Sequence, residues 1–514
     1  MGISGVRMTF GIVMVMGSML AFAEVNDRRE TAPESSADFA WAPAQLERWR
    51  SNTREFMNQL PLKERSNQQG PLPRRQEDRV ALFEQKGRFR DHIRQHSQPT
   101  KKISPIGDLD RPENLINPQL GADGKWLPIY DRLEDMETAR LTSRATAQPW
   151  SDSYWPVYQG GLASRYGARG FPSESRDWEV YKEFSTRSES TANLSPIEKY
   201  ELLFGHVSGS LNRKMWDIGQ FYQDKYGEVE TWIGICHGWS YASFNLPRPR
   251  KAFRVKTELG TANASEIVFY PSDVKALGSY LWSQSELTYR FVGTRCGEKH
   301  PPQDPNGRID SNYPECVDSN PGTWHISLVN EVGLRNRSLV FDSSYDYEVW
   351  NFPIFSYSYA YFNPSTGRMV DTLAKATVSA KFAGDKYAKY RHANAKSIVG
   401  IAMKVSYSAS QEASHRRTDS GEDDTINSVH YVYDLEIDSG GHIIGGEWYQ
   451  NAHPDFLWTM SPDTEVVSSG DGIAKSPWDG VTAPPADWRD AVAESALSSH
   501  LLPKAVRKLF DLSQ

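Results

Sequence analysis

Cys236 has the surroundings in this chain that most clearly favour covalent chemistry. It lies within Thr231-Trp-Ile-Gly-Ile-Cys-His-Gly-Trp239, where Gly234 permits a turn before it. The apolar stretch that follows predicts a short helix ending at Pro247. In the first turn of a helix, backbone amides and the helix dipole stabilise a thiolate, and the same amides can form an oxyanion hole. A buried structural cysteine beside a tight turn is the alternative interpretation.

A thiol nucleophile needs a base, and the base needs a partner that orients it. His237 adjoins Cys236, but neighbouring helical side chains point apart, so we expect no direct pairing. The better candidate is His325, in TWHISLV, whose alternation predicts a strand. The next predicted strand, SLVFDSS, contains Asp342, and a hairpin between the strands would bring Asp342 beside His325. The alternative is a sheet histidine satisfied by an ordinary neighbour.

Two tryptophans flank the proposed nucleophile. Trp232 and Trp239 would wall a narrow apolar tunnel that excludes water from the reaction. They are explained equally well as core aromatics. With His237, they are candidates for substrate binding or oxyanion stabilisation.

The N-terminus predicts export. Arg7 precedes an apolar run that ends in Ala21-Phe-Ala23, which is typical of a signal peptide over residues 1–23. No later stretch approaches the ~20 apolar residues of a membrane-spanning helix, so we expect no span after cleavage. The protein is therefore expected to be secreted or periplasmic.

Export determines the oxidation state expected of the three cysteines. In an oxidising compartment two of them are expected to pair. Cys296 and Cys316 bound a polar loop that closes easily, which leaves Cys236 alone. A leftover thiol in an exported protein is either reactive or a buried structural residue, and the count alone does not choose between them.

The composition and layout favour a large α+β protein. The chain has 514 residues, 16 Trp and 24 Tyr, and its net charge of -7 argues against a nucleic-acid partner. Residues 24–104 are polar, basic and helical, so they are a candidate prosegment or else a spacer. Residues 105–460 carry helices first and then mostly strands, with an exposed loop at 408–426. Residues 461–514 combine an irregular excursion with a C-terminal helix broken at Pro503.

Several segments together resemble the elicitor-type transglutaminases secreted by oomycetes and shared with marine bacteria. They cover roughly residues 145–460 in fair order. The resemblance is carried by WPVYQGGLASRYG, TWIGICHGWSYASFNLPRP, YPSDVKALGSYLW, RCG followed by DPNGRID and NPGTWH, FDSSYDYEVWNFP and YDLEIDSGGHIIGGEWYQNAHPDFLW.

The resemblance implies a papain-like or transglutaminase-like core. Its helical N-terminal part would carry the nucleophile, and its antiparallel sheet would carry the histidine and the aspartate. The family's Cys-His-Asp triad falls on Cys236, His325 and Asp342, and Cys296 and Cys316 resemble its disulfide. The implied activity is glutamine–lysine isopeptide cross-linking of proteins through a thioester, with deamidation when water intervenes.

Calcium is the cofactor that the family implies, and no organic cofactor is expected. An acidic loop with Asp304, Asn306, Asp310 and Asp318 offers oxygen ligands, but its spacing matches no EF-hand, and solvated loop charges explain it better. The metal site therefore stays unassigned.

The chain also departs from the family. Its Val349-Trp-Asn-Phe-Pro353 peptide lacks the basic residues that follow in oomycete members, because Phe355 and Ser358 stand there. Immune recognition of the peptide is thus not implied. Two other functions remain open: a papain-like protease or amidase, which would use the same triad, and an inactive secreted interaction protein.

Overall fold

The structure is a computed structural model, and some predictions fall outside the residues that it describes. These include the signal peptide, residues 66–104 of the basic segment, Cys296 and Asp318. The described residues are 36–65, 110–139, 142–168, 171, 178–182, 191–206, 208–261, 264–284, 289–294, 301–310, 312–313, 316–317, 319–344, 348–461 and 464–514.

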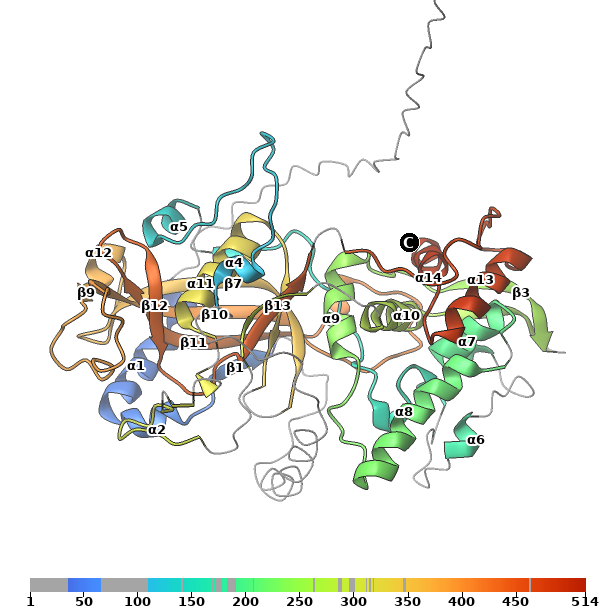
Figure 1. The fold of residues 1–514 in the computed structure, drawn as a ribbon, viewed down its shortest axis with the longest axis horizontal. Coiled ribbons are helices and arrows are strands. Elements are labelled where there is room, and N and C mark those ends of the chain that lie inside the picture. The colour runs from blue at the N-terminus through green and yellow to red at the C-terminus, as the bar shows by residue number, and fades with distance from the viewer. Residues whose placement is uncertain are drawn as a thin grey trace, which may run out of the picture.

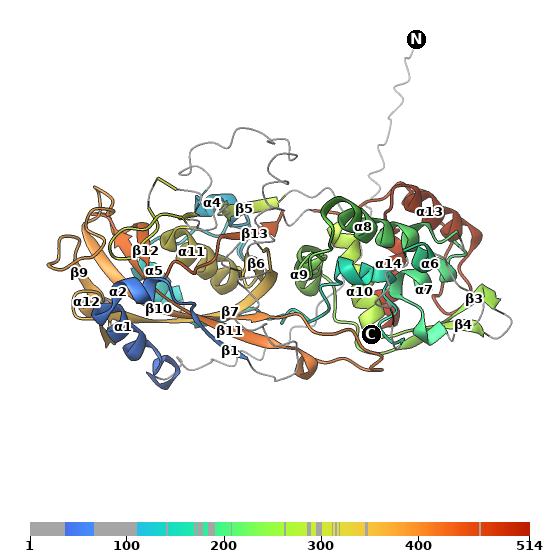
Figure 2. The ribbon, with the colours of Figure 1, turned by 90° about the horizontal axis from the view of Figure 1, so that it is seen from below.

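The described residues form two lobes that lie side by side (Figures 1 and 2). The sheet lobe is built on an 11-stranded sheet in which every pairing is antiparallel and whose main path is β1-β11-β10-β7-β6-β13-β5. Its strands are β1 (Leu62–Arg65), β2 (Thr142–Arg144), β5 (Tyr289–Gly293), β6 (Leu339–Asp342), β7 (Asn351–Asn363), β8 (Arg368–Val370), β9 (Thr377–Ser379), β10 (Ser397–Ser408), β11 (Ile426–Ile437), β12 (Ile443–Trp448) and β13 (Phe456–Met460).

Helices accompany the sheet, because its central strands are buried on both faces. The central strands β7, β10 and β11 are almost entirely buried, so apolar and aromatic residues on both faces need cover. The helices of this lobe are α1 (Ala42–Ser51), α2 (Thr53–Met57), α4 (Pro112–Leu115), α5 (Leu133–Ala139), α11 (Pro321–Leu328) and α12 (Leu373–Ala376), and the π-helix Val329–Leu334 continues α11.

The helical lobe contains the nucleophile candidate. Its α9 begins at Cys236 and packs on α10 within the lobe and on β7 of the sheet lobe, so Cys236 lies where the lobes meet. The elements are α6 (Trp178–Lys182), α7 (Pro196–Leu203), α8 (Ser210–Tyr226), α9 (Cys236–Asn245), α10 (Pro271–Ser283), α13 (Ala486–Leu497), α14 (Pro503–Leu512) and the ribbon of β3 (Phe253–Thr261) and β4 (Ala264–Phe269).

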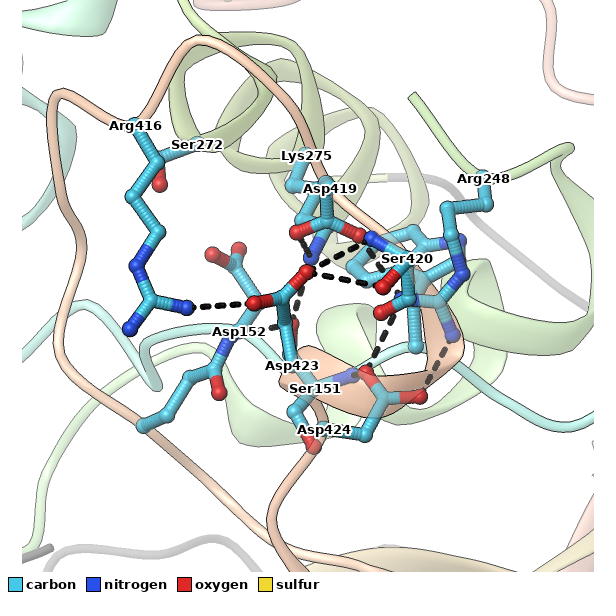
Figure 3. Close-up of polar contacts among 12 residues, drawn as sticks. Ser151, Asp152, Arg248, Ser272, Lys275, Arg416, Asp419, Ser420, Asp423 and Asp424 are labelled. Carbon is cyan, nitrogen blue, oxygen red and sulfur yellow. Dashed lines mark hydrogen bonds and ion pairs between the residues drawn. The ribbon is translucent and has the colours of Figure 1, made fainter. Parts of the chain in front are cut away.

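A loop of the sheet lobe ties the two lobes together. Residues 409–425, here called the interlobe loop, connect β10 to β11 and run along the helical lobe. Asp419 accepts hydrogen bonds from Lys275 Nζ at 2.6 Å and from Arg248 Nη1 at 2.7 Å, as Figure 3 shows. Arg248 also pairs with the fully buried Asp424 carboxylate. The prediction of an exposed loop is therefore wrong for its anchor residues.

The described part of the basic segment is integrated into the sheet lobe. Leu46, Trp49, Phe56 and Met57 of α1 and α2 join a hydrophobic cluster with side chains of the sheet. Strand β1 pairs with β11, and Lys63 Nζ donates to the carbonyl of Ser343 at 3.3 Å. Residues 36–65 therefore pack as a structural part of the sheet lobe, and cleavage of the segment stays untested.

Several element boundaries of the described chain follow from local sequence signals. Ser195 forms a capping box with Glu198 at the start of α7, and α8 ends at Gly227, whose φ is 80°. The turn 438–441 joins β11 to β12 as a hairpin. Pro503 begins α14 after the break. In the described chain, no helix is long and apolar enough to cross a membrane.

The strand predicted for TWHISLV is wrong, because these residues form helix α11. The side chain of Asn320 accepts a hydrogen bond from Gly322 N at 2.8 Å, and Pro321 occupies the first helical turn. Helical hydrogen bonding then continues through the π-helix to Leu334, where the hairpin was expected. Alternation over a short apolar run does not distinguish a strand from a buried helix.

Candidate active site

Two glycines allow the chain to bring Cys236 to the lobe junction. A Cβ at Gly234 would lie 2.3 Å from the carbonyl oxygen of Tyr154, and one at Gly238 would lie 2.2 Å from that of Ser279. Any side chain would therefore force the backbones apart. Gly234 lets the segment before α9 approach Tyr154, and Gly238 lets α9 pack closely on α10.

The Cys236 thiol is free and held between main-chain and side-chain groups of one segment. It is 4% exposed, and its Sγ lies 3.8 Å from the carbonyl oxygen of Val349 and 3.6 Å from Nδ2 of Asn351. Burial raises the thiol pKa, while hydrogen bonds from the backbone and side chain of Asn351 act in the opposite direction. The nearby charge of Asp342 also raises this pKa.

Asp342 reaches the same site from the sheet. It ends β6 directly opposite Asn351 of β7, so the two side chains project from one face of the sheet. The fully buried carboxylate accepts hydrogen bonds from the backbone N–H groups of Ser344 at 3.0 Å and Trp350 at 2.9 Å. The site therefore combines a thiol from α9 with a carboxylate and an amide from neighbouring strands.

His325, the predicted base, has contacts of its own on helix α11. Its imidazole is fully buried, with Nδ1 2.8 Å from the hydroxyl of Tyr433 and the ring packed edge-on against Tyr359 at 4.7 Å. Both views place α11 apart from α9, with β13 between them (Figures 1 and 2). Burial lowers the His325 pKa to about 3. None of these contacts joins His325 to Cys236, so its role as the base stays a prediction.

The comparison with protein families decides the relationship of this region. The sequence model of the transglutaminase elicitor family matches residues 220–474, which include Cys236, Asp342 and Asn351. Over these residues the chain is similar to the transglutaminase elicitor family. This confirms the resemblance that the motifs indicate.

One solved structure similar to the chain is the crystal structure of the GP42 transglutaminase from Phytophthora sojae. It is 22% identical, the match covers 72% of this chain and 94% of that one, and the TM-score is 0.45. The comparison with curated proteins finds no match.

The three residues near Cys236 that were candidates for substrate binding or oxyanion stabilisation each contact the surrounding protein. They are His237, Trp239 and Trp232. The His237 side chain interacts with the backbone of Ser283, and burial lowers its pKa. Trp239 is fully buried and donates to the carbonyl of Trp150 at 3.1 Å, as expected of a core aromatic. Trp232 is partly buried and its indole N–H pairs with Glu230.

Sequence reasoning did not single out Asn351, Tyr154 or Trp350 as site residues. Trp350 packs edge-on against Tyr154 at 5.0 Å, beside the thiol contacts of Val349 and Asn351. The available signal was the Val349–Pro353 peptide, which the family resemblance had already marked. Its position at the start of β7, opposite Asp342, is what brings it to Cys236.

In the acidic loop considered for calcium, the carboxylates of Asp304 and Asp310 accept hydrogen bonds from protein groups. Asp304 Oδ1 accepts from the backbone N–H groups of Asn306 and Arg308, and its Oδ2 accepts from the Tyr390 hydroxyl at 3.0 Å. Asp310 Oδ1 accepts from Asn312 N at 2.9 Å. Among the described residues, no group of three or more His, Cys, Asp or Glu side chains could hold a metal ion.

Of the two cysteines predicted to form a disulfide, only Cys316 lies among the described residues. Cys316 is disulfide-bonded and buried. Its predicted partner, Cys296, lies outside the described residues, so that assignment stays a prediction.

Proposed function

We propose that this chain is an exported protein-glutamine γ-glutamyltransferase with a papain-like or transglutaminase-like core and Cys236 as its nucleophile. The observation that carries the proposal is the site at the lobe junction. A free thiol begins α9, and Asp342 and Asn351 lie beside it, all within the family match. Its partners would be proteins with accessible glutamine and lysine side chains.

The chemistry requires two displacements at one carbonyl carbon. The sulfur of Cys236 attacks the side-chain amide of a peptide-bound glutamine and forms a C–S bond. The C–N bond breaks, and the proton lost by the thiol ends on the departing nitrogen, which leaves as ammonia. A lysine amine then attacks the thioester, the C–S bond breaks, and the sulfur is regenerated. Water in place of the amine converts the glutamine into glutamate.

Burial of the sulfur favours one alternative, an inactive secreted interaction protein. A thiol that is 4% exposed, with a pKa raised by burial, is a weak nucleophile unless the site opens. A Cys236 that resists alkylation at neutral pH in the absence and presence of a glutamine peptide would identify this alternative.

Incorporation of a fluorescent amine into a glutamine-containing protein tests the proposal. The mature full chain is expected to incorporate the amine, and the Cys236→Ala variant is not. Asn245→Ala, at the exposed end of the same helix, serves as the matched control and should retain activity. Full incorporation by Cys236→Ala would eliminate the mechanism, and new peptide N-termini without incorporation would identify a protease. Parallel assays with and without calcium test the expected metal dependence.

A further inference from the structure

Asn351 occupies a position that the thiol chemistry does not yet explain. It begins β7, pairs with Asp342 of β6, and is 5% exposed. Its main-chain carbonyl accepts a hydrogen bond from Ser240 Oγ at 2.7 Å, so the start of β7 is tied to the first turns of α9. The residue is thus fixed to both elements that form the site.

The orientation of the Asn351 side-chain amide follows from its neighbour. Trp458 Nε1 lies 2.7 Å from Oδ1 of Asn351. An indole N–H only donates, so the amide oxygen must face Trp458 and the amide NH₂ must face the opposite direction. In that direction lies the sulfur of Cys236, 3.6 Å from Nδ2. The tryptophan therefore determines which end of the amide the sulfur meets.

Asn351 also presents a second donor to the sulfur. Its backbone N–H and its side-chain amide each favour the ionised form of Cys236, and the backbone N–H of His237 adds a third such interaction. Donors that converge on one buried atom stabilise negative charge there, because an anion in a low-dielectric site gains more from a hydrogen bond than a neutral thiol does. This set of donors offsets part of the cost of burying a thiolate.

We propose that Asn351 is a catalytic residue that holds the ionised sulfur of Cys236 through its side-chain amide, with Trp458 as the positioning residue that orients this amide. The inference rests on the proposed function for its biological meaning. It concerns the thiolate itself, however, and the thiolate is measurable without any acyl transfer.

A pH titration of thiolate ultraviolet absorbance tests the role of Asn351, with the Cys236→Ala chain as the blank. Asn351→Ala is expected to lower the thiolate fraction at neutral pH by about tenfold, the effect of one lost charge-assisted hydrogen bond. Asn351→Asp keeps the shape but replaces the donor with an acceptor, and it should lower the fraction at least as much. Asn245→Ala should leave the titration midpoint unchanged.

Trp458→Phe separates orientation from direct contact. It frees the amide to turn and should shift the midpoint in the same direction but by less. Added to Asn351→Ala it should produce no further shift, because Trp458 acts through that amide.

Midpoints that are unchanged in both Asn351 variants, with normal thermal unfolding, would overturn the inference. An additive Trp458→Phe shift would overturn the positioning role. If the midpoints move as expected while the parent chain incorporates no amine, the proposed function fails and the assignment of Asn351 stands. If incorporation needs Cys236 but the midpoints do not move, the proposed function stands and the assignment of Asn351 fails.

Discussion

Cys236 and His325 are both buried and both belong to residue types that can react. Their surroundings differ in whether they stabilise the charged form of the side chain. The sulfur lies between two lobes and faces N–H donors of Asn351 that favour its ionised form. The imidazole lies within one lobe, between α11 and the sheet, where tyrosines pack around it. Burial is common to both, so burial alone does not identify a site.

The difference shows what a charged intermediate needs. A thiolate at Cys236 would find donors already oriented, whereas an imidazolium at His325 has no carboxylate among its described contacts and its pKa falls to about 3. A neutral imidazole can accept a proton from a thiol, but one whose pKa is lowered this far is a weak base for that transfer. We therefore expect the two residues to respond oppositely to substitution.

The largest expected effect is on catalysis. Cys236→Ser should reduce amine incorporation by more than about a thousandfold, because it removes the nucleophile itself. His325→Gln should keep incorporation within about tenfold of the parent chain, because the imidazole packs against Tyr433 and Tyr359 and burial makes it a weak base. Rate measurements at saturating amine compare the two. A His325→Gln chain that is folded but as inactive as Cys236→Ser would restore the predicted triad.

The second effect is on stability, and here substitution of His325 should have the larger effect. His325→Gln should lower the free energy of unfolding by about 2 kcal/mol, since it disturbs a packed ring and its hydrogen bond to Tyr433. Cys236→Ala should cost less, about 1 kcal/mol, because it removes only one sulfur atom from the lobe junction. Denaturant titration measures both. Equal costs would mean that the two regions do not differ in structural importance.

Part of this comparison was accessible from the sequence. The glycines around Cys236, the helix after it and the carboxylate at the end of SLVFDSS follow from local patterns, and the structure has all three. They were predictable because a turn, a helix start and a short buried strand each depend on neighbouring residues.

The remaining features depend on contacts between distant segments. His325 was assigned to a strand because TWHISLV alternates, although Asn320 and Pro321 before it are a helix-start signal. Asn351 reaches Cys236 only because β7 pairs with β6 and packs on α9, and Trp458 comes from β13. The spacing of residues along the chain does not indicate these contacts between distant segments. The position of the Asn351 amide beside the sulfur could therefore not be predicted.

The third effect is the pH dependence that His325 gives to folding. Its folded-state pKa of about 3 lies below the ordinary value of 6.5, so below pH 6.5 the unfolded chain binds a proton that the folded chain does not. The free energy of unfolding is therefore unaffected by protonation of His325 above pH 6.5. It falls by about 1.4 kcal/mol per pH unit as the pH decreases from 6.5 towards about 3.

Glutamine does not titrate, so the cost of His325→Gln should shrink and then change sign as the pH falls through this window. Denaturant titrations of parent and variant at several pH values measure the difference. The same series on Cys236→Ala should show a constant difference there, because the thiol stays protonated in both states. A cost of His325→Gln that is independent of pH would mean that the imidazole is solvated and not buried among the tyrosines.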